Sequence, residues 1–519
     1  MAGLTGRLLA AGAWTLVGQA ATTVASLVAT PFGIRALGVE LYGVLSLISL
    51  VIGYALFADL GMGQASTKFA SEQHARHRSD GEAQVIWTAL AMVIAASTAI
   101  ALILGLASPF LMRHLFSLPE RLRGLATLAL QVALLGFVAR NVAGVLNTAT
   151  LVRLRFRLDT AINTGPAVLQ ILLVPVVLWL GGGLLGAVLV MVGASITTAV
   201  LHGVSGLVLL PQLRRVQFRR DLLRPMLRFG SGMVAAGVVA MFLLNMERLL
   251  LVRLGSVDLL GYYAVAANLG NIVGMLPAGI MNSLLPVFSR LRETSQHEQL
   301  EALYWRVHRI VLLGMPPLLV GACAFARPFI GLWAGPEFGR ASTGAFYLLA
   351  LGQAINLVTR VSKEMLKAHG ETTVFARFYL WQIVPYAVVG VVAIRWWGVT
   401  GAALAYLLRV LADAVLNIRA ATLASGIAFS PLAGRRLRYA GVLALIVAPL
   451  ALLWGARDWR HEIALGISLV ICLAAYCVLT WRSIMTESER EWIRRSRDGR
   501  RSPWPGPPVS VEPPAAPRA

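Results

Sequence analysis

Seven ionisable side chains in long apolar stretches of this sequence are candidates for chemistry. An ionised group at the centre of a membrane-spanning helix costs about 2.5–3.5 kcal/mol on insertion scales, so each is a candidate functional residue. Arginine binds phosphate through paired hydrogen bonds, and a carboxyl group can exchange a proton. The pattern therefore predicts anion binding by the arginines and ion coupling by the acids. The seven residues are Asp59, Arg140, Glu247, Arg248, Arg360, Arg409 and Asp413.

Two of these arginines lie deep in their apolar stretches. Arg140 has Asn141 beside it and no acidic residue within one helical turn. Its partner must therefore come from another helix, from water or from a bound substrate. Arg409 precedes Asp413 by four residues, a spacing at which two side chains meet on one helix face. Arg409 either pairs with Asp413 or contacts the substrate; both readings stay open, and both can hold together.

The other charged positions differ in depth and in neighbours. Glu247 and Arg248 are adjacent and point about 100° apart on a helix, so either each has a separate partner or the span end is hydrated. We predict that Glu247 is a protonatable coupling site, with Asp59 and Asp413 as further ion-coupling candidates. Asp59 ends its stretch and also fits an interfacial acid. Arg360 lies near a stretch end, where a long side chain can reach the headgroups. The predicted substrate-binding set is Arg140, Arg409, Arg248 and Arg360.

The composition indicates which elements must hold these charges. Of the 519 residues, 57% are hydrophobic and 13% are charged, with a mean hydropathy of +0.72. A soluble protein carries about 25% charged residues, and no soluble core could hide so large an apolar fraction. We therefore predict an all-α integral membrane protein, which excludes soluble enzymes, secreted disulfide scaffolds and disordered chains.

Motifs for catalysis are missing from the sequence. The three cysteines lie in apolar stretches without metal-ligand spacing, and the chain has no Walker loop for ATP. The predicted outer loops are short, whereas a glycan-processing enzyme acting outside usually needs a sizeable one. We expect no metal, no cofactor and no enzyme activity.

About fourteen stretches are long enough to cross a bilayer, which takes about 20 residues. With the N-terminus inside, the C-terminus is also inside, and most of the 46 Lys and Arg residues fall on the inner side. Basic blocks at 153–157 and 214–228 contribute to the net charge of +22, so membrane lipids are expected partners and nucleic acid is not. The predicted spans are 9–30, 41–60, 84–107, 125–147, 164–182, 184–210, 230–252, 260–284, 309–331, 344–362, 376–396, 398–418, 439–456 and 462–481.

An internal repeat divides the predicted spans. LGVELYG at 37–43 resembles LGSVDLLGYY at 254–263, and GLLGAVL at 183–189 resembles GVTGAAL at 398–404. Both offsets correspond to six spans, so the halves share one orientation and form two pseudo-symmetric six-helix lobes, a transporter architecture. The predicted domains are 1–229 (spans 1–6), 230–438 (spans 7–12), 439–481 (spans 13–14) and a disordered cytoplasmic tail at 482–519, basic and then proline-rich.

Three segments also resemble a known family. They are ALGVELYGVLSLISLV, FADLGMGQASTKFASE and MERLLLVRLGSVDLLGYYAVAANL. They are similar to the polysaccharide (O-antigen type) lipid-linked oligosaccharide flippases of the multidrug/oligosaccharidyl-lipid/polysaccharide exporter superfamily. The resemblance covers roughly residues 10–480. Members often carry Asp where Glu247 stands, so the acidic character is retained.

The resemblance implies a transport function in the bacterial plasma membrane. An undecaprenyl-pyrophosphate-linked glycan would pass from the inner to the outer leaflet between the lobes, by alternating access coupled to H⁺ or Na⁺. Polysaccharide-assembly proteins are further candidate partners. Fourteen spans favour lipid-linked cargo over drug export, and the lipid II flippase branch stays open. The alternatives are an ion-coupled multidrug-type antiporter and a membrane glycosyltransferase or polymerase.

Overall fold

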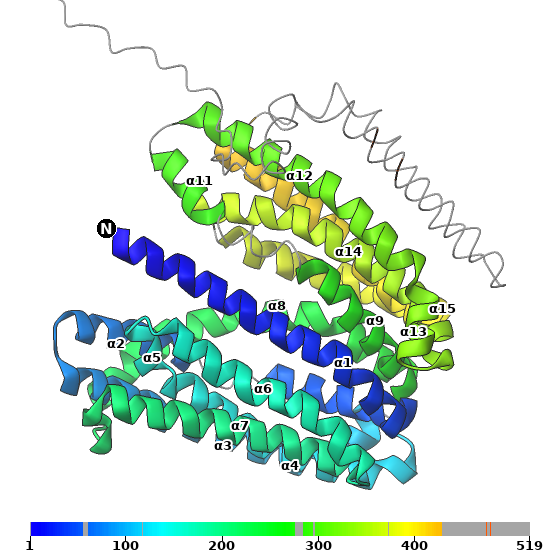
Figure 1. Ribbon diagram of the computed structural model, residues 1–519, viewed down its shortest axis with the longest axis horizontal. Coiled ribbons are helices and arrows are strands. Elements are labelled where there is room, and N and C mark those ends of the chain that lie inside the picture. The colour runs from blue at the N-terminus through cyan, green and yellow to red at the C-terminus, as the bar shows by residue number, and fades with distance from the viewer. Residues whose placement is uncertain are drawn as a thin grey trace, which may run out of the picture. The chain divides into compact units, whose positions relative to one another are not determined.

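The computed structural model describes residues 2–55, 61–116, 118–275, 284–293, 296–371 and 373–427, with positions 474 and 478. Within these ranges every regular element is a helix, as predicted, and Figure 1 colours the helices along the chain. Asp59, the predicted spans 439–456 and 462–481, and the predicted tail lie outside the described residues.

The described helices follow the predicted spans closely. A π-helical turn, Leu111–Leu115, extends α3, and short 3₁₀ turns at Pro211–Arg214 and Arg220–Leu222 lead into α8. The helices are α1 (Ala2–Ala55), α2 (Met62–Ala75), α3 (Ser79–Phe110), α4 (Glu120–Leu146), α5 (Thr148–Val152), α6 (Phe156–Trp179), α7 (Gly183–Leu209), α8 (Leu223–Leu254), α9 (Val257–Met275), α11 (Leu284–Glu293), α12 (His297–Ala324), α13 (Ala326–Trp333), α14 (Pro336–Ala368) and α15 (Thr373–Ser425).

Two of these helices are each two helices joined at a glycine. In α1 the backbone leaves the helical conformation at Gly38 (φ 72°, ψ 176°), and in α15 it does so at Gly398 (φ 55°, ψ −124°). A positive φ is strained for residues with a Cβ atom, so glycine is suited to both positions. The predicted loops between spans 1 and 2 and between spans 11 and 12 are these single-residue breaks.

The predicted span 309–331 is interrupted. Helix α12 ends at Ala324 and α13 begins at Ala326, with Phe325 between them at φ −109° and ψ 10°. Pro328 explains the break, because its ring would clash with the carbonyl group of residue 324 in a continuous helix.

Seven helices of the described chain are long and apolar enough to cross a membrane. Many of their large apolar side chains point outward; Leu106 is 82% exposed and Trp179 is 83% exposed. Such surfaces are stable against lipid and not against water. The seven helices are Val17–Ala55, Ser79–Leu115, Glu120–Val152, Phe156–Trp179, Gly183–Leu209, Pro336–Ala368 and Arg377–Ser425.

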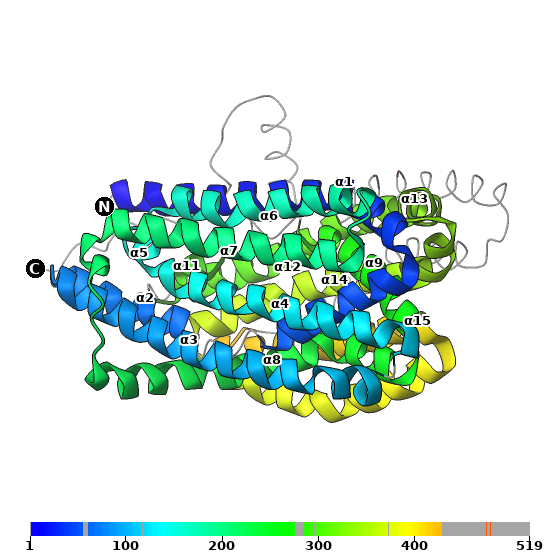
Figure 2. The same cartoon turned by 90° about the horizontal axis from the view of Figure 1, so that it is seen from below.

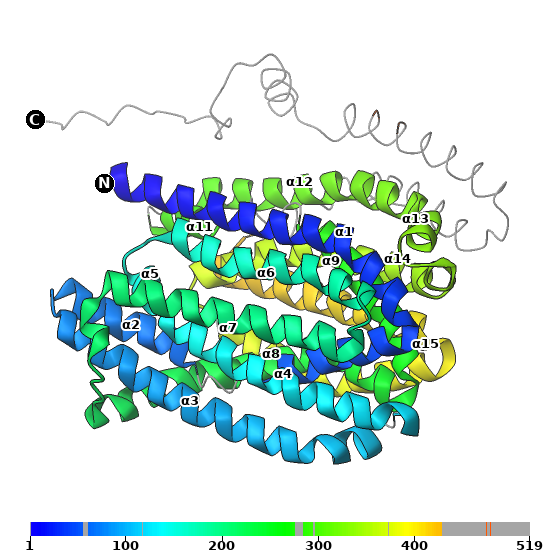
Figure 3. The same cartoon turned by 60° about the horizontal axis from the view of Figure 1, so that its bottom comes forward.

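The chain divides into two compact units. In the first unit α4 packs against α3 and α7, and α6 packs against α1 and α7 (Figures 2 and 3). In the second unit Tyr304 of α12 is buried and hydrogen-bonded to Ser362 of α14 at 2.8 Å. The first unit comprises Met1–Ile272, Pro328–Leu349 and Thr373–Arg409, and the second comprises Val273–Arg327, Ala350–Thr372 and Val410–Ala519. The predicted lobe boundary between residues 229 and 230 stays a prediction.

One pair of repeat segments shares an unusual backbone conformation. Gly183 begins α7 with φ 55°, and Gly398, its counterpart in the repeat, breaks α15 with φ 55°. Both follow a stretch that ends in tryptophan, Trp179 and Trp397. The shared positive φ at equivalent positions agrees with the predicted repeat.

Candidate functional site

Glu247 of α8 lies at the centre of a buried polar group in the first unit. It is 4% exposed, and the hydroxyl of Tyr386 in α15 donates a hydrogen bond to its Oε2 atom at 2.6 Å. The hydroxyl of Tyr263 in α9 donates to its Oε1 atom at 3.1 Å. Helical spacing positions the acid, since Leu243 and Met246 pack with Tyr386 in one apolar cluster and carry Glu247 with them. Both carboxylate oxygens therefore have a hydroxyl donor.

Tyr386 also connects Glu247 to Arg409. The guanidinium carbon of Arg409 lies 5.5 Å from the ring centroid of Tyr386 and 5.2 Å from that of Tyr406. These distances fit cation–π interactions, and Arg409 is 7% exposed. The structure thus brings together one predicted coupling acid and one predicted substrate-binding arginine through a tyrosine between them.

The two hydroxyl donors of Glu247 belong to Tyr263 and Tyr386. The charge of Arg248 acts on the phenol groups of Tyr42 and Tyr54 in α1 and on that of Tyr263, and the charge of Glu247 also acts on Tyr54 and Tyr263. The Tyr54 hydroxyl is buried and has no hydrogen-bond partner among the described residues. Sequence reasoning missed all of these tyrosines because an uncharged phenol adds little to a count of intramembrane charges.

Arg140 and Arg360 are exposed, on α4 and α14 respectively. Neither has a hydrogen bond or ion pair to another described residue. Next to Arg140, Asn141 is 6% exposed and its amide nitrogen lacks a hydrogen-bond partner in the described part of the chain. Arg140 therefore presents its charge beside an amide donor that has no described acceptor. The roles assigned to both arginines stay predictions.

Asp413 forms an ion pair that the sequence did not predict. Lys363 of α14 donates to Asp413 Oδ2 at 2.8 Å, and Asn417 donates to Oδ1 at 3.0 Å. Asp413 is 3% exposed. Lys363 stands one residue beyond the predicted end of its span at 362, so it was counted as an inner-loop residue. The candidate coupling role of Asp413 stays a prediction.

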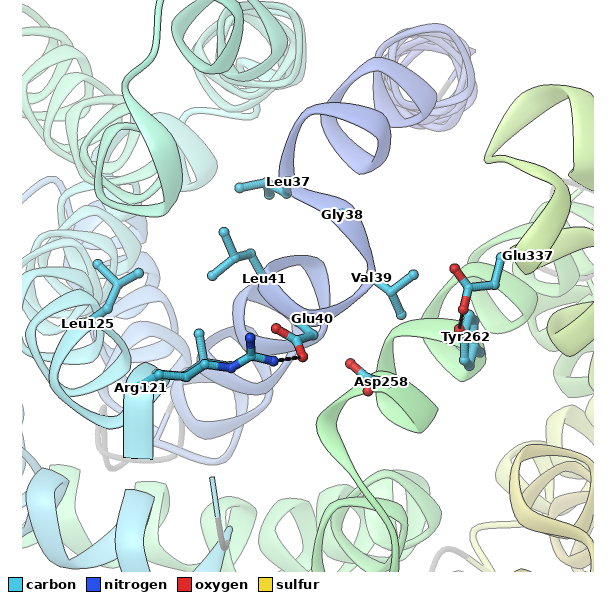
Figure 4. Close-up of a pocket in the computed structure, with 11 residues that line it drawn as sticks. Leu37, Gly38, Val39, Glu40, Leu41, Arg121, Leu125, Asp258, Tyr262 and Glu337 are labelled. Carbon is cyan, nitrogen blue, oxygen red and sulfur yellow. Dashed lines mark hydrogen bonds and ion pairs between the residues drawn. The ribbon is translucent and has the colours of Figure 1, made fainter. Parts of the chain in front are cut away.

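A second polar site lies where four helices of the first unit begin or restart (Figure 4). The cavity has a volume of about 620 Å³. Arg121, at the start of α4, forms an ion pair with Glu40 of α1. Tyr262 of α9 donates a hydrogen bond to Glu337, at the start of α14, at 2.5 Å. Asp258 lies at the start of α9 beside them. All five positions fall in or next to segments predicted to face outside.

The described residues contain no group of three His, Cys, Asp or Glu side chains that could hold a metal ion. The polar sites instead combine single carboxylates with phenols, amides, lysine or arginine.

Solved structures with a similar arrangement are membrane transporters. The lipid II flippase MurJ in an inward closed conformation aligns with a TM-score of 0.68 and 9% identity, over 91% of this chain and 99% of that one. An inward-facing multidrug resistance MATE family transporter of the MOP superfamily aligns with a TM-score of 0.67 and 16% identity, over 78% and 96%. The fold is therefore that of a multi-pass membrane transporter.

Sequence comparison gives the family. Residues 34–343 match the family model described as polysaccharide biosynthesis protein. The chain belongs to this family and is an integral protein of the bacterial inner membrane. It is 20% identical over 192 residues to a putative O-antigen transporter of Shigella flexneri. That match spans 36% of this chain and 44% of the relative. The relatives are transporters and flippases, which agrees with the prediction that the protein is not an enzyme.

Proposed function

We propose that this protein flips an undecaprenyl-pyrophosphate-linked oligosaccharide from the inner to the outer leaflet for surface polysaccharide synthesis. The observation that carries the proposal is a match to a polysaccharide biosynthesis family on a chain with a flippase-like fold. A glycan joined to a long lipid needs a path for its charged headgroup while the lipid tail stays in the bilayer. Alternating access between two lobes provides such a path.

The ion-coupling site we propose is Glu247, with H⁺ as the coupling ion. Each carboxylate oxygen accepts a phenol hydroxyl, and a single carboxylate can take up and release one proton. The buried acid can alternate between a neutral and an ionised form. This change would alter the hydrogen bond from Tyr386 and, through the tyrosine ring, its cation–π interaction with Arg409. Arg409 then responds to the proton on Glu247 through one shared side chain.

The arginines provide the chemistry for binding the pyrophosphate. Guanidinium groups bind phosphate oxygens in pairs, and Arg140 is exposed without a described partner. We propose Arg140 and Arg409 as the principal phosphate contacts, with Arg248 and Arg360 as additional ones. Polysaccharide-assembly proteins remain predicted partners.

The function is tested by leaflet exposure in proteoliposomes. A labelled polyprenyl-pyrophosphate oligosaccharide is loaded, and its access to an impermeant reagent is followed under an imposed pH gradient. We expect protein-dependent exposure that is reduced at least tenfold in Arg140→Ala and in Glu247→Gln. Glu298→Gln, an exposed acid in the first turn of α12, is the matched control and keeps the wild-type rate.

Two outcomes would overturn this assignment. No exposure with several glycans, combined with pH-driven uptake of cationic drugs, would make the protein a multidrug-type antiporter. Exposure that survives both Arg140→Ala and Arg409→Ala would keep the flippase and remove these arginines from the path.

A further inference from the structure

The two copies of the first repeat motif contact each other in the folded chain. VELYG at 39–43 aligns with VDLLG at 257–261, so Gly43 corresponds to Gly261 and Val39 to Val257. A Cβ atom on Gly43 would lie 2.3 Å from the carbonyl oxygen of Val257. A Cβ atom on Gly261 would lie 3.1 Å from the carbonyl oxygen of Val39. The contact is reciprocal, with each glycine packed on the valine of the other copy.

The reciprocal contact joins two helix starts at the outer polar cavity. Val39 and Gly43 lie in the first turns after the Gly38 break, and Val257 and Gly261 lie in the first turns of α9. Figure 4 draws the two segments facing each other, with Glu40 and Asp258 at equivalent positions of the repeat. We call the four residues Val39, Gly43, Val257 and Gly261 the glycine contact. The two backbones approach closely at the glycines, and beside them Val257 and Leu260 pack with Val44 in one buried apolar cluster.

The three carboxylates beside the glycine contact differ in their hydrogen-bond and ion-pair partners. Glu40 has Arg121 as its ion partner, and Glu337 accepts the Tyr262 hydroxyl. The Oδ1 atom of Asp258 is buried and has no hydrogen-bond partner among the described residues. Burial, followed by the negative charges of Glu40 and Glu337, raises the pKa of Asp258, and Arg121 opposes this rise. A permanently closed contact would keep this acid uncompensated, whereas a contact that opens would hydrate it.

The element beside the contact can bend. Gly38 has a φ of +72°, and a Cβ atom there would meet nothing within 4 Å. Its open surroundings and left-handed backbone permit a hinge directly ahead of Val39.

We propose that the glycine contact is the closed gate between the transport path and the outer face of the membrane. The proposal rests on the alternating access of the proposed function, because the two helix starts must separate for the headgroup to leave outward. The two glycines let the backbones of the repeats approach closely when the gate is closed. Opening would hydrate Asp258, whose Oδ1 atom is buried in the closed contact.

The gate is tested by thiol labelling from the outside, which needs no glycolipid. The reporter is Asn268→Cys in a variant whose native cysteines are alanine. Asn268 is exposed on α9, and its amide donates to the Tyr42 hydroxyl at 3.5 Å, so it lies inward of the contact and faces α1. A membrane-impermeant thiol reagent is added to right-side-out vesicles, and the labelling rate is measured.

We expect Gly43→Ala to increase the labelling rate about tenfold, because its methyl group holds the two turns apart and shifts the population toward the open gate. Gly261→Ala, with a longer contact, increases the rate less. The matched control is Gly144→Ala in α4, where a Cβ atom meets nothing within 4 Å; its rate equals that of the parent.

The outcomes separate the gate from the transported substrate. Parental labelling in folded Gly43→Ala and in folded Gly261→Ala, checked by thermal melting, would overturn the gate. If Gly43→Ala does not fold, Gly261→Ala decides alone. Faster labelling in a protein that flips no glycolipid would keep the gate and reject the proposed substrate. Flipping without any change in labelling would reject the gate and keep the flippase.

Discussion

The two hydrogen bonds that Glu247 accepts differ in length. Tyr386 donates at 2.6 Å and Tyr263 at 3.1 Å, and a hydrogen bond to a charged group contributes about 1.5–3 kcal/mol. We therefore expect Tyr386→Phe to reduce pH-driven flipping more than Tyr263→Phe. The proteoliposome assay at several pH values measures both rates.

A neighbouring tyrosine provides the control for this ranking. The Tyr54 hydroxyl has no hydrogen-bond partner among the described residues. Tyr54→Phe therefore removes the same hydroxyl group without breaking a hydrogen bond to a described residue. Its rate should match wild type. Equal losses in all three variants would mean that the hydroxyls act through packing and not through Glu247.

Asp258 makes the outer gate sensitive to pH. Its pKa is raised in the closed structure by burial and by two neighbouring carboxylates, and in the open gate water returns the pKa toward its ordinary value. The closed state thus binds the proton more tightly, so closing is favoured as the pH falls and is lost as the pH rises through the raised pKa.

Labelling of Asn268→Cys should consequently accelerate with pH more steeply in the parent than in Asp258→Asn. Both proteins share the same reporter thiol, so the ratio of their rates removes the titration of the thiol itself. A ratio that does not change between about pH 4 and pH 8 would contradict a role for this acid.

At the scale of elements, one buried acid joins three helical segments. Glu82 of α3 is 1% exposed and accepts two hydrogen bonds from Arg153, at 2.5 and 3.2 Å. His74 of α2 lies 3.3 Å from the same carboxylate, and Arg153 directly follows α5. Sequence analysis assigned Arg153 to the topology signal, whereas the structure also gives it a buried partner.

Breaking this ion pair should destabilise the protein strongly. Removing one member of a buried pair leaves the other charge uncompensated, at about 3–5 kcal/mol. We expect Glu82→Ala and Arg153→Ala each to lower the melting temperature in detergent. The double variant should lower it by less than the sum of the two single-variant decreases. Additive losses would indicate that the two side chains act independently.

The sequence predicts helices better than contacts. Hydropathy locates the spans because lipid selects for apolar residues over a fixed length. The same pattern does not reveal the Pro328 break or the pairing of Lys363 with Asp413, since each depends on one residue at a span end. Glu247 was found because a charge in lipid is rare. Its phenol donors and the glycine contact were missed, because neutral side chains and close backbone approach leave no mark in composition.

At the scale of the whole molecule, the duplicated fold is functionally asymmetric. At the outer cavity, Glu40 in the first repeat faces a cation, Arg121, whereas Asp258, its equivalent in the second, has the acid Glu337 nearby. Of the predicted ion-coupling candidates among the described residues, Glu247 lies in the first unit and Asp413 in the second. On the proposed mechanism, the duplicated motif would supply the matching surfaces of the gate, and the diverged charges would couple it to protons.

The membrane potential should then act on the charged substrate, whereas the pH gradient should act on the protein. An inside-negative potential favours outward movement of an anionic headgroup by about 2.3 kcal/mol per charge per 100 mV. This work is done on the substrate, so a potassium diffusion potential should accelerate flipping in wild type and in the residual activity of Glu247→Gln. A pH gradient works through the buried acid and should accelerate wild type alone. Stimulation of Glu247→Gln by the pH gradient would move the coupling site to another acid, with Asp413 next to be tested.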